Sequence, residues 1–131
     1  MTANELRIGN YINPKVNDIV VKDEFHKVEP TTMMMILGLI DNRGIEFEPI
    51  ELTPEILEKC GFGKYPTGCY CKNLKTDDSY LAIDLKYGNG VWLNIYQGKR
   101  ENTIPLKHIK HLHQLQNLYF ALTGQELEIT L

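Results

Sequence analysis

Short apolar stretches separated by turn-forming residues fill the first fifty positions of the chain. Val16–Lys22 is rich in β-branched residues, as is typical of β-strands. Asn13-Pro14 and Asp41–Gly44 are turn signals, Gly9-Asn10 suggests a bend, and Pro30 cannot donate to a strand ladder. The pattern predicts five short strands, at residues 6–12, 16–22, 25–29, 31–40 and 45–50. Five such strands with tight turns favour a small, strongly bent sheet, and we expect an SH3-like barrel.

The longest apolar run, Met33–Ile40, lies in the fourth of these strands. We expect that strand to be covered on both faces, because it shows no alternation of apolar and polar positions. Its eight residues are far fewer than the roughly 20 that a membrane span needs. The N-terminal sequence MTANELRIGN has no basic n-region or apolar h-region, so we expect no signal peptide and a cytoplasmic protein.

A short helix is predicted in the middle of the chain. Thr53 fits the N-cap, Pro54 the first helical position, and Glu55 the first turn, where a negative charge is favourable. Gly61 is expected to end the helix after Cys60.

Residues 69–97 then read as an antiparallel meander. The stretches 80–87 and 91–97 flank Gly88-Asn89-Gly90, which we expect to form a three-residue loop. This loop places apolar residues on one face, with Tyr87 opposite Val91, Leu85 opposite Leu93, and Ile83 opposite Ile95. The other face then pairs Lys86 with Trp92, Asp84 with Asn94, and Ala82 with Tyr96.

The last elements are a long helix at 109–123, ended by Gly124, and a strand at 126–131. The apolar residues of the helix cover an arc of roughly 200°, so we expect packing against two elements. Gln116 falls inside that arc and must find hydrogen-bond partners. Lys110, His113, Gln114 and Asn117 form the predicted wet side.

These elements predict an α+β fold in a single domain of 131 residues. We expect a strand-rich lobe at 1–52 and a second lobe, of helices and sheet, at 53–131. The composition is 43% hydrophobic, which is enough for a core. The net charge of −3 is uneven, since residues 1–66 carry a net −4 and residues 67–131 a net +1.

The cysteines and histidines give weak metal-site signals. Cys69 and Cys71 would place two thiols on one face of a strand, and Cys60 is the third cysteine. The sequence has no second closely spaced pair of cysteines, so we favour small strand residues over half of a zinc site. His108, His111 and His113 lie at the helix start, where His113 would point away from His111. We therefore expect no metal and no cofactor.

Three segments resemble one protein family. They are Asn4–Tyr11, Ile50–Phe62 and Ile109–Leu127, and the last contains the string HQLQNLYFALTG. The sequence resembles a family of small uncharacterised proteins from Bacteroides-type genomes and their phages and mobile elements. The central segment departs from that family in lacking an early aromatic residue and in having less acidic character. The resemblance implies a cytoplasmic protein of phage or mobile-element origin, and it carries over no catalytic residue.

The candidate binding surface is the second face of the meander, with Tyr80, Trp92 and Tyr96, and Lys86 beside Trp92. Aromatic side chains on a sheet stack bases or sugars, or anchor a protein partner. The competing interpretation is that the N-terminal lobe or a second copy covers this face.

A basic stretch at 86–113 offers phosphate contacts through Lys86 and through a second group of cations: Lys99, Arg100, Lys107 and Lys110.

The leading functional hypothesis is a non-enzymatic binding module that acts on an unknown protein partner or through self-association, with no membrane contact. The alternative is a nucleic-acid-binding accessory protein that uses the same face with the basic stretch. A small enzyme is the third hypothesis, because no Walker, HExxH, GxSxG or EF-hand motif is present.

Overall fold

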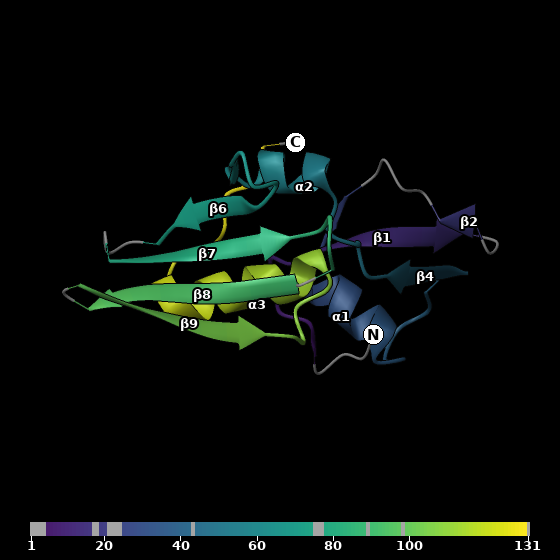
Figure 1. Cartoon of the computed structure of the whole chain (residues 1–131). Coiled ribbons are helices and arrows are strands. Elements are labelled where there is room, and N and C mark those ends of the chain that lie inside the picture. The colour runs from purple at the N-terminus through teal and green to yellow at the C-terminus, as the bar shows by residue number, and fades with distance from the viewer. Residues whose placement is uncertain are drawn as a thin grey trace. The chain divides into compact units, whose positions relative to one another are not determined.

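A computed structural model describes residues 5–16, 19–20, 25–42, 44–74, 78–88, 90–97 and 99–130. It contains helices and two antiparallel sheets, which confirms the predicted α+β class (Figure 1). The chain divides into two compact units: unit 1 holds residues 1–51 and 111–117, and unit 2 holds 52–110 and 118–131. The predicted boundary at 52/53 lies one residue from the first division, but residues 111–117 belong to unit 1. No helix among the described residues is long and apolar enough to cross a membrane.

Strand β1 (Tyr11–Val16) is the centre of the sheet in unit 1. It pairs antiparallel with three strands: β2 (Ile19–Val20), β3 (His26–Lys27) and β4 (Ile45–Glu48). The expected turn at Asn13-Pro14 is wrong, because both residues lie inside β1. They pair with β4 only, so the missing N–H of Pro14 can face the side without a described partner strand. The bend at Gly9 exists, with φ of 101°, but residues 6–10 before β1 form no strand.

The strand predicted at 31–40 is wrong, since helix α1 spans Pro30–Ile36. A reciprocal capping box starts the helix: the Glu29 side chain accepts from the Thr32 backbone, and Thr32 Oγ1 accepts from the Glu29 backbone N–H at 3.2 Å. Pro30 occupies the first turn, where its missing N–H costs nothing. The prediction of an SH3-like barrel is therefore also wrong, because the strand predicted at 31–40 as its fourth does not form.

The core of unit 1 gathers around three buried residues, Leu6, Ile12 and Val28. Further half-buried apolar side chains pack against them: Met33, Ile36 and Phe47. The apolar run at 33–40 nevertheless does not become core, since Met34, Leu37, Leu39 and Ile40 are all exposed. Leu39 keeps 68% of its surface accessible, which contradicts the expected burial on both faces.

Two amides of helix α3 (Leu112–Thr123) bind the segment before β1 and the first residue of β1. Gln116, 1% exposed, accepts from Tyr11 N–H at 2.8 Å and donates from Nε2 to Gly9 O at 3.2 Å. Asn117 Oδ1 accepts from Asn10 Nδ2 at 2.8 Å and from Arg7 Nε at 3.1 Å. The expectation that a buried Gln116 finds partners is confirmed.

Unit 2 opens with helix α2 (Pro54–Lys59), which the sequence predicted. Thr53 Oγ1 accepts from Ile56 N–H at 3.3 Å, and Gly61 follows the C-cap Cys60 with φ of 84°. A five-stranded antiparallel meander follows in sequence order. Its strands are β5 (Gly63–Lys64), β6 (Tyr70–Asn73), β7 (Ser79–Asp84), β8 (Gly90–Gln97) and β9 (Arg100–Leu106).

The register of β7 and β8 differs from the prediction. Ile83 pairs with Val91 and Ala82 with Trp92, so the predicted pair of Ile83 with Ile95 and the three-residue loop are wrong. The chain leaves β7 early, because Asp84 Oδ1 accepts from Tyr87 N–H at 3.1 Å and forms a turn there. The shift is an even number of residues, so the side chains that remain within β7 and β8 keep their predicted faces.

The C-terminal elements also need correction. Helix α3 begins at Leu112 rather than at 109, because His111 forms a β-bridge with Glu51 and Leu112 N–H binds Ile50 O at 2.8 Å. Residues 126–130 form no strand. Thr130 N–H donates to Lys59 O at 2.9 Å, at the end of helix α2, so this segment bonds to a helix end rather than to a strand.

The second half of α3 lies on the Leu81 face of the meander. Lys72, which pairs with Leu81, places Nζ 5.9 Å from the centroid of the Tyr119 ring. In Figure 1 the yellow C-terminal end of α3, which belongs to unit 2, lies behind β8, so the opposite face of the sheet is turned toward the viewer.

Candidate functional site

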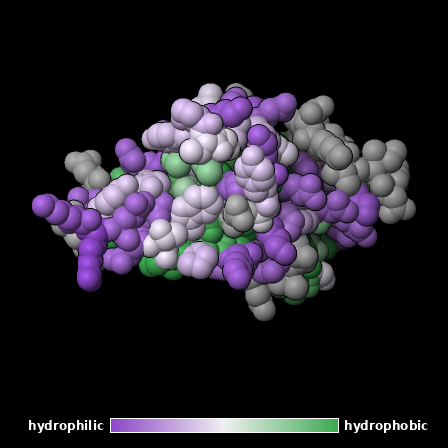
Figure 2. All heavy atoms as spheres, viewed as in Figure 1, coloured by the Kyte–Doolittle hydropathy of each residue, from purple (hydrophilic) through white to green (hydrophobic). Residues whose placement is uncertain are grey.

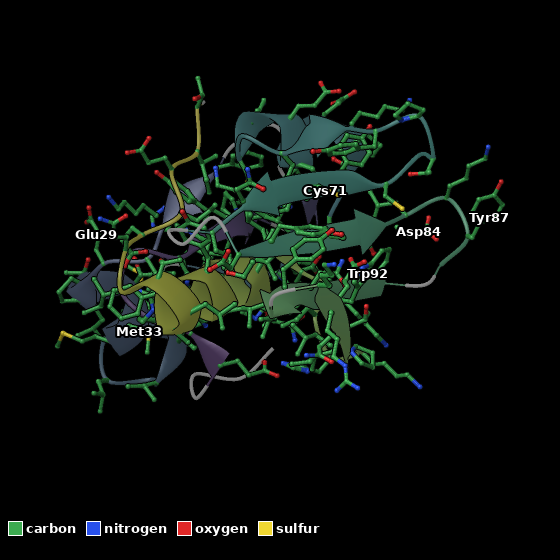
Figure 3. The ribbon with its side chains drawn as sticks, turned by 60° about the vertical axis from the view of Figure 1, so that its left-hand side comes forward. Glu29, Met33, Cys71, Asp84, Tyr87 and Trp92 are labelled. Atoms are coloured by element: carbon green, nitrogen blue, oxygen red, sulfur yellow. The ribbon has the colours of Figure 1, made fainter. Side chains whose placement is uncertain are left out.

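We call the surface opposite α3 the aromatic face; it carries Tyr80 from β7 and Trp92 and Tyr96 from β8. Pairing places Cys71, Ala82, Trp92 and Pro105 in one row across four strands. Figure 3 labels Cys71, Asp84 and Trp92 on their three neighbouring strands. In the space-filling view, side chains of intermediate hydropathy gather over the middle of the sheet (Figure 2). The structure thus brings the three predicted aromatic residues to one face.

Tyr80 and Tyr96 form a ring pair at one end of this face. Their centroids are 5.9 Å apart with an interplanar angle of 31°, and Tyr80 Oη donates to Glu101 Oε1 at 2.9 Å. Desolvation raises the pKa of Tyr80, and the hydrogen bonds with Tyr96 and Glu101 add to this. Tyr80 is therefore held neutral and oriented, while Tyr96 keeps 41% of its surface exposed.

Small and polar side chains lie buried on the same face of the sheet as the aromatic rings. Ala82, Asp84 and Asn94 are all buried, and Asn94 Oδ1 accepts from Thr103 Oγ1 at 2.7 Å. Trp92 is half-buried. The face therefore combines aromatic side chains with buried polar groups that are largely hydrogen-bonded. Such a surface is better suited to binding a partner than to catalysis.

Lys86 does not lie opposite Trp92, which is a correction of the predicted pairing. Ala82 takes that place, and Lys86 belongs to the connection between β7 and β8. Its Nζ lies 5.3 Å from the centroid of the Tyr87 ring. Tyr87 itself extends from this connection away from the sheet (Figure 3).

The other predicted cations are exposed but divided between two ends of β9. Lys99 and Arg100 stand at its start, whereas Lys107 and Lys110 follow its end. Six strand residues lie between Arg100 and Lys107, so the two pairs are roughly 20 Å apart at about 3.3 Å per residue. Because the Glu101 carboxylate lies at the start of β9, beside Tyr80, the cations of the described residues form no continuous basic border along the aromatic face.

Two thiols of unit 2, those of Cys60 and Cys71, are poorly suited to nucleophilic attack. Burial raises the pKa of Cys60 to about 11, although Lys72 lowers it in part. The pKa of Cys71 is also raised, by burial first and then by Cys69. Within the described part of the chain, no three or more His, Cys, Asp or Glu side chains gather in a way that could hold a metal ion.

The histidine pair of unit 1 differs from the prediction. His111 precedes α3, so its ring stacks on that of His113 at 5.9 Å and 14° rather than pointing away. His113 is 1% exposed, not on a wet side. Neither of its ring nitrogens has a hydrogen-bond partner among the described residues. Burial and the neighbouring His111 lower the pKa of His113, against an opposing effect of Glu5.

This lowered pKa predicts acid sensitivity. The unfolded chain takes up a proton near pH 6.5, whereas folded His113 resists it, so stability is lost as the pH falls from about 6.5 toward the folded pKa. We expect His113→Leu to reduce the fall in Tm between neutral and mildly acidic buffer. His108→Leu, at an exposed position, is the control. Equal acid sensitivity of all three proteins would refute this role for His113.

Sequence reasoning missed an exposed apolar surface at the end of α1. We call it the apolar turn; it consists of Met34, Leu37, Leu39 and Ile40. Clustered exposed apolar residues of this kind mark interaction surfaces. The Glu29 and Thr32 capping pair around Pro30 was the available signal for a helix here.

No protein-family model, curated protein or solved structure matches this chain. The resemblance of Asn4–Tyr11, Ile50–Phe62 and Ile109–Leu127 to the Bacteroides and phage family therefore stays a prediction.

Proposed function

We propose that the protein is a non-enzymatic interaction module that binds another protein through the aromatic face. The observation that carries the proposal is the Tyr80–Tyr96 ring pair, fixed by Glu101 and still accessible at Tyr96. Aromatic anchors of this kind dominate the energetics of protein interfaces. A ring that is already ordered loses little side-chain entropy on binding. A cytoplasmic location and a phage or mobile-element origin belong to the same proposal and rest on the family resemblance.

The charge distribution favours a protein partner over nucleic acid. Stacked bases bring phosphates with them, and binding then needs cations along the path of the backbone. Here the carboxylate of Glu101 stands beside the exposed ring, and the exposed cations at the two ends of β9 are roughly 20 Å apart. The thiol pKa values of Cys60 and Cys71 give no support to the enzyme hypothesis.

The test replaces Trp92 and Tyr96 together by Ala and compares this variant with Tyr87→Ala. Tyr87 is an exposed aromatic residue outside the aromatic face, so this variant controls for non-specific binding through exposed aromatic side chains. We expect the wild type and Tyr87→Ala to capture the same proteins from cells. The double variant should capture at least tenfold less of each of them, while its Tm stays close to that of the wild type. Quantitative mass spectrometry measures the capture.

Two results would contradict the proposal. Equal capture by the double variant and Tyr87→Ala would show that the face binds nothing, and an unfolded double variant would show that it is core. A salt-sensitive gel shift with a single-stranded oligonucleotide, lost in the double variant, would instead support the nucleic-acid alternative.

A further inference from the structure

Strand β9 is the free edge of the five-stranded sheet. It pairs with β8, and no other described strand pairs with it. Six of its seven residues are exposed, and Ile104 keeps 44% of its surface accessible. A free edge presents unpaired backbone N–H and C=O groups that another strand can use.

Two observations show which groups of β9 point outward. Tyr96 N–H donates to Asp78 O at 2.7 Å, so the even-numbered residues of β8 bond toward β7 and the odd-numbered residues toward β9. Leu93 pairs with Ile104 and Ile95 with Asn102, so the even-numbered residues of β9 bond to β8. Pro105, which has no N–H, agrees with this, because it belongs to the outward-facing set. The outward donors are therefore the N–H groups of Glu101 and Thr103.

We propose that a second copy of this chain pairs with β9 in antiparallel orientation, centred on Asn102. Each Glu101 then lies opposite Thr103 of the second copy, and the two pairs exchange four backbone hydrogen bonds. Ile104 lies opposite Arg100 of the second copy, so the aliphatic stem of the arginine covers the exposed Ile104.

The two neighbouring symmetric registers are centred on Glu101 and on Thr103. Charge repulsion disfavours the first, and a missing backbone N–H disfavours the second. Centring on Glu101 places two carboxylates directly opposite each other, which is destabilising. Centring on Thr103 places Pro105 in a bonding position where it has no N–H to give. The register at Asn102 avoids both defects, so the sequence of β9 is complementary to itself in one register.

This dimer would join two five-stranded sheets along their edges. The twofold axis runs perpendicular to the sheet, so both aromatic faces point to the same side. Because Pro105 ends the ladder on each side, the interface is small, and we expect a dissociation constant on the order of 10–100 µM. The inference concerns self-association and does not depend on whether the aromatic face binds a further protein.

The experiment measures sedimentation velocity of the full chain over a wide concentration range, with two variants of one residue. Thr103→Pro removes the outward N–H and leaves the bonds to β8 in place, whereas Thr103→Val keeps that N–H. Both variants lose the hydroxyl contact to Asn94, so this loss is matched. We expect the wild type and Thr103→Val to dimerise, and Thr103→Pro to bind at least tenfold more weakly.

Amide hydrogen exchange on the wild type keeps the proposal testable if Thr103→Pro does not fold. The amides of Glu101 and Thr103 should become protected as concentration rises, and that of the exposed Lys64 in β5, at the other edge of the sheet, should not. A wild type that stays monomeric at every concentration, a dimer unaffected by Thr103→Pro, or dimerisation without protection of these two amides would overturn the proposal.

Discussion

Replacing Gln116 by Leu is expected to lower the free energy of unfolding by about 2–6 kcal/mol. Leu has a similar size, so the change removes the amide without opening a large cavity. Two backbone groups of half-buried residues would lose their partners, namely the Tyr11 N–H and the Gly9 carbonyl. Each buried polar group without a partner costs roughly 1–3 kcal/mol. The loss should be large because Gln116 is almost fully buried.

Chemical denaturation of Gln116→Leu measures this loss. Gln125→Leu makes the same chemical change at an exposed position just after α3, and we expect it to alter stability by about 0.5 kcal/mol or less. Similar stability of the two variants would mean that the Gln116 amide does not hold the segment before β1.

The second large effect is expected from Thr32→Val, which should lower the free energy of unfolding by about 1–3 kcal/mol. Val has nearly the same shape as Thr but lacks the hydroxyl. That hydroxyl accepts from the Glu29 N–H at 3.2 Å and lies 2.9 Å from His26 Nε2, and Thr32 is buried. The variant therefore breaks the capping box that starts α1 and leaves polar groups unpaired.

Thr31→Val is the matched control, since Thr31 is the exposed neighbour in the same helical turn. Both substitutions raise strand propensity equally, so the comparison isolates the cap. If 31–40 were a strand, as the sequence suggested, the two variants should behave alike. Helix content from far-ultraviolet circular dichroism and the denaturation midpoint distinguish these outcomes.

Elements whose signals are local were predictable from the sequence. The helix at 54–59 was found because its cap, its proline and its terminal glycine are adjacent in the chain. Helix α1 was missed because an unbroken apolar run has no period, so pattern alone cannot separate a buried strand from a helix. Pro30 then supported the wrong choice, since proline both ends strands and begins helices.

In the candidate site, too, local features could be predicted and features that depend on strand pairing could not. Alternation along β7 and β8 fixes which face each side chain occupies, so Tyr80, Trp92 and Tyr96 were grouped correctly. Alternation does not distinguish registers that differ by an even number of residues. The position of Lys86 and the bond from Tyr80 to Glu101 depend on register and on β9, so neither could be predicted.

Cys60 makes the core of unit 2 observable by thiol chemistry. With a pKa near 11 in place of the ordinary 9.0, only about one Cys60 in a thousand is a thiolate at pH 8, against about one in ten for an ordinary thiol. Its side chain is also fully buried. A disulfide reagent should therefore modify Cys60 only when the core opens. The modification rate of this natural cysteine would then report the opening of unit 2 without any introduced label.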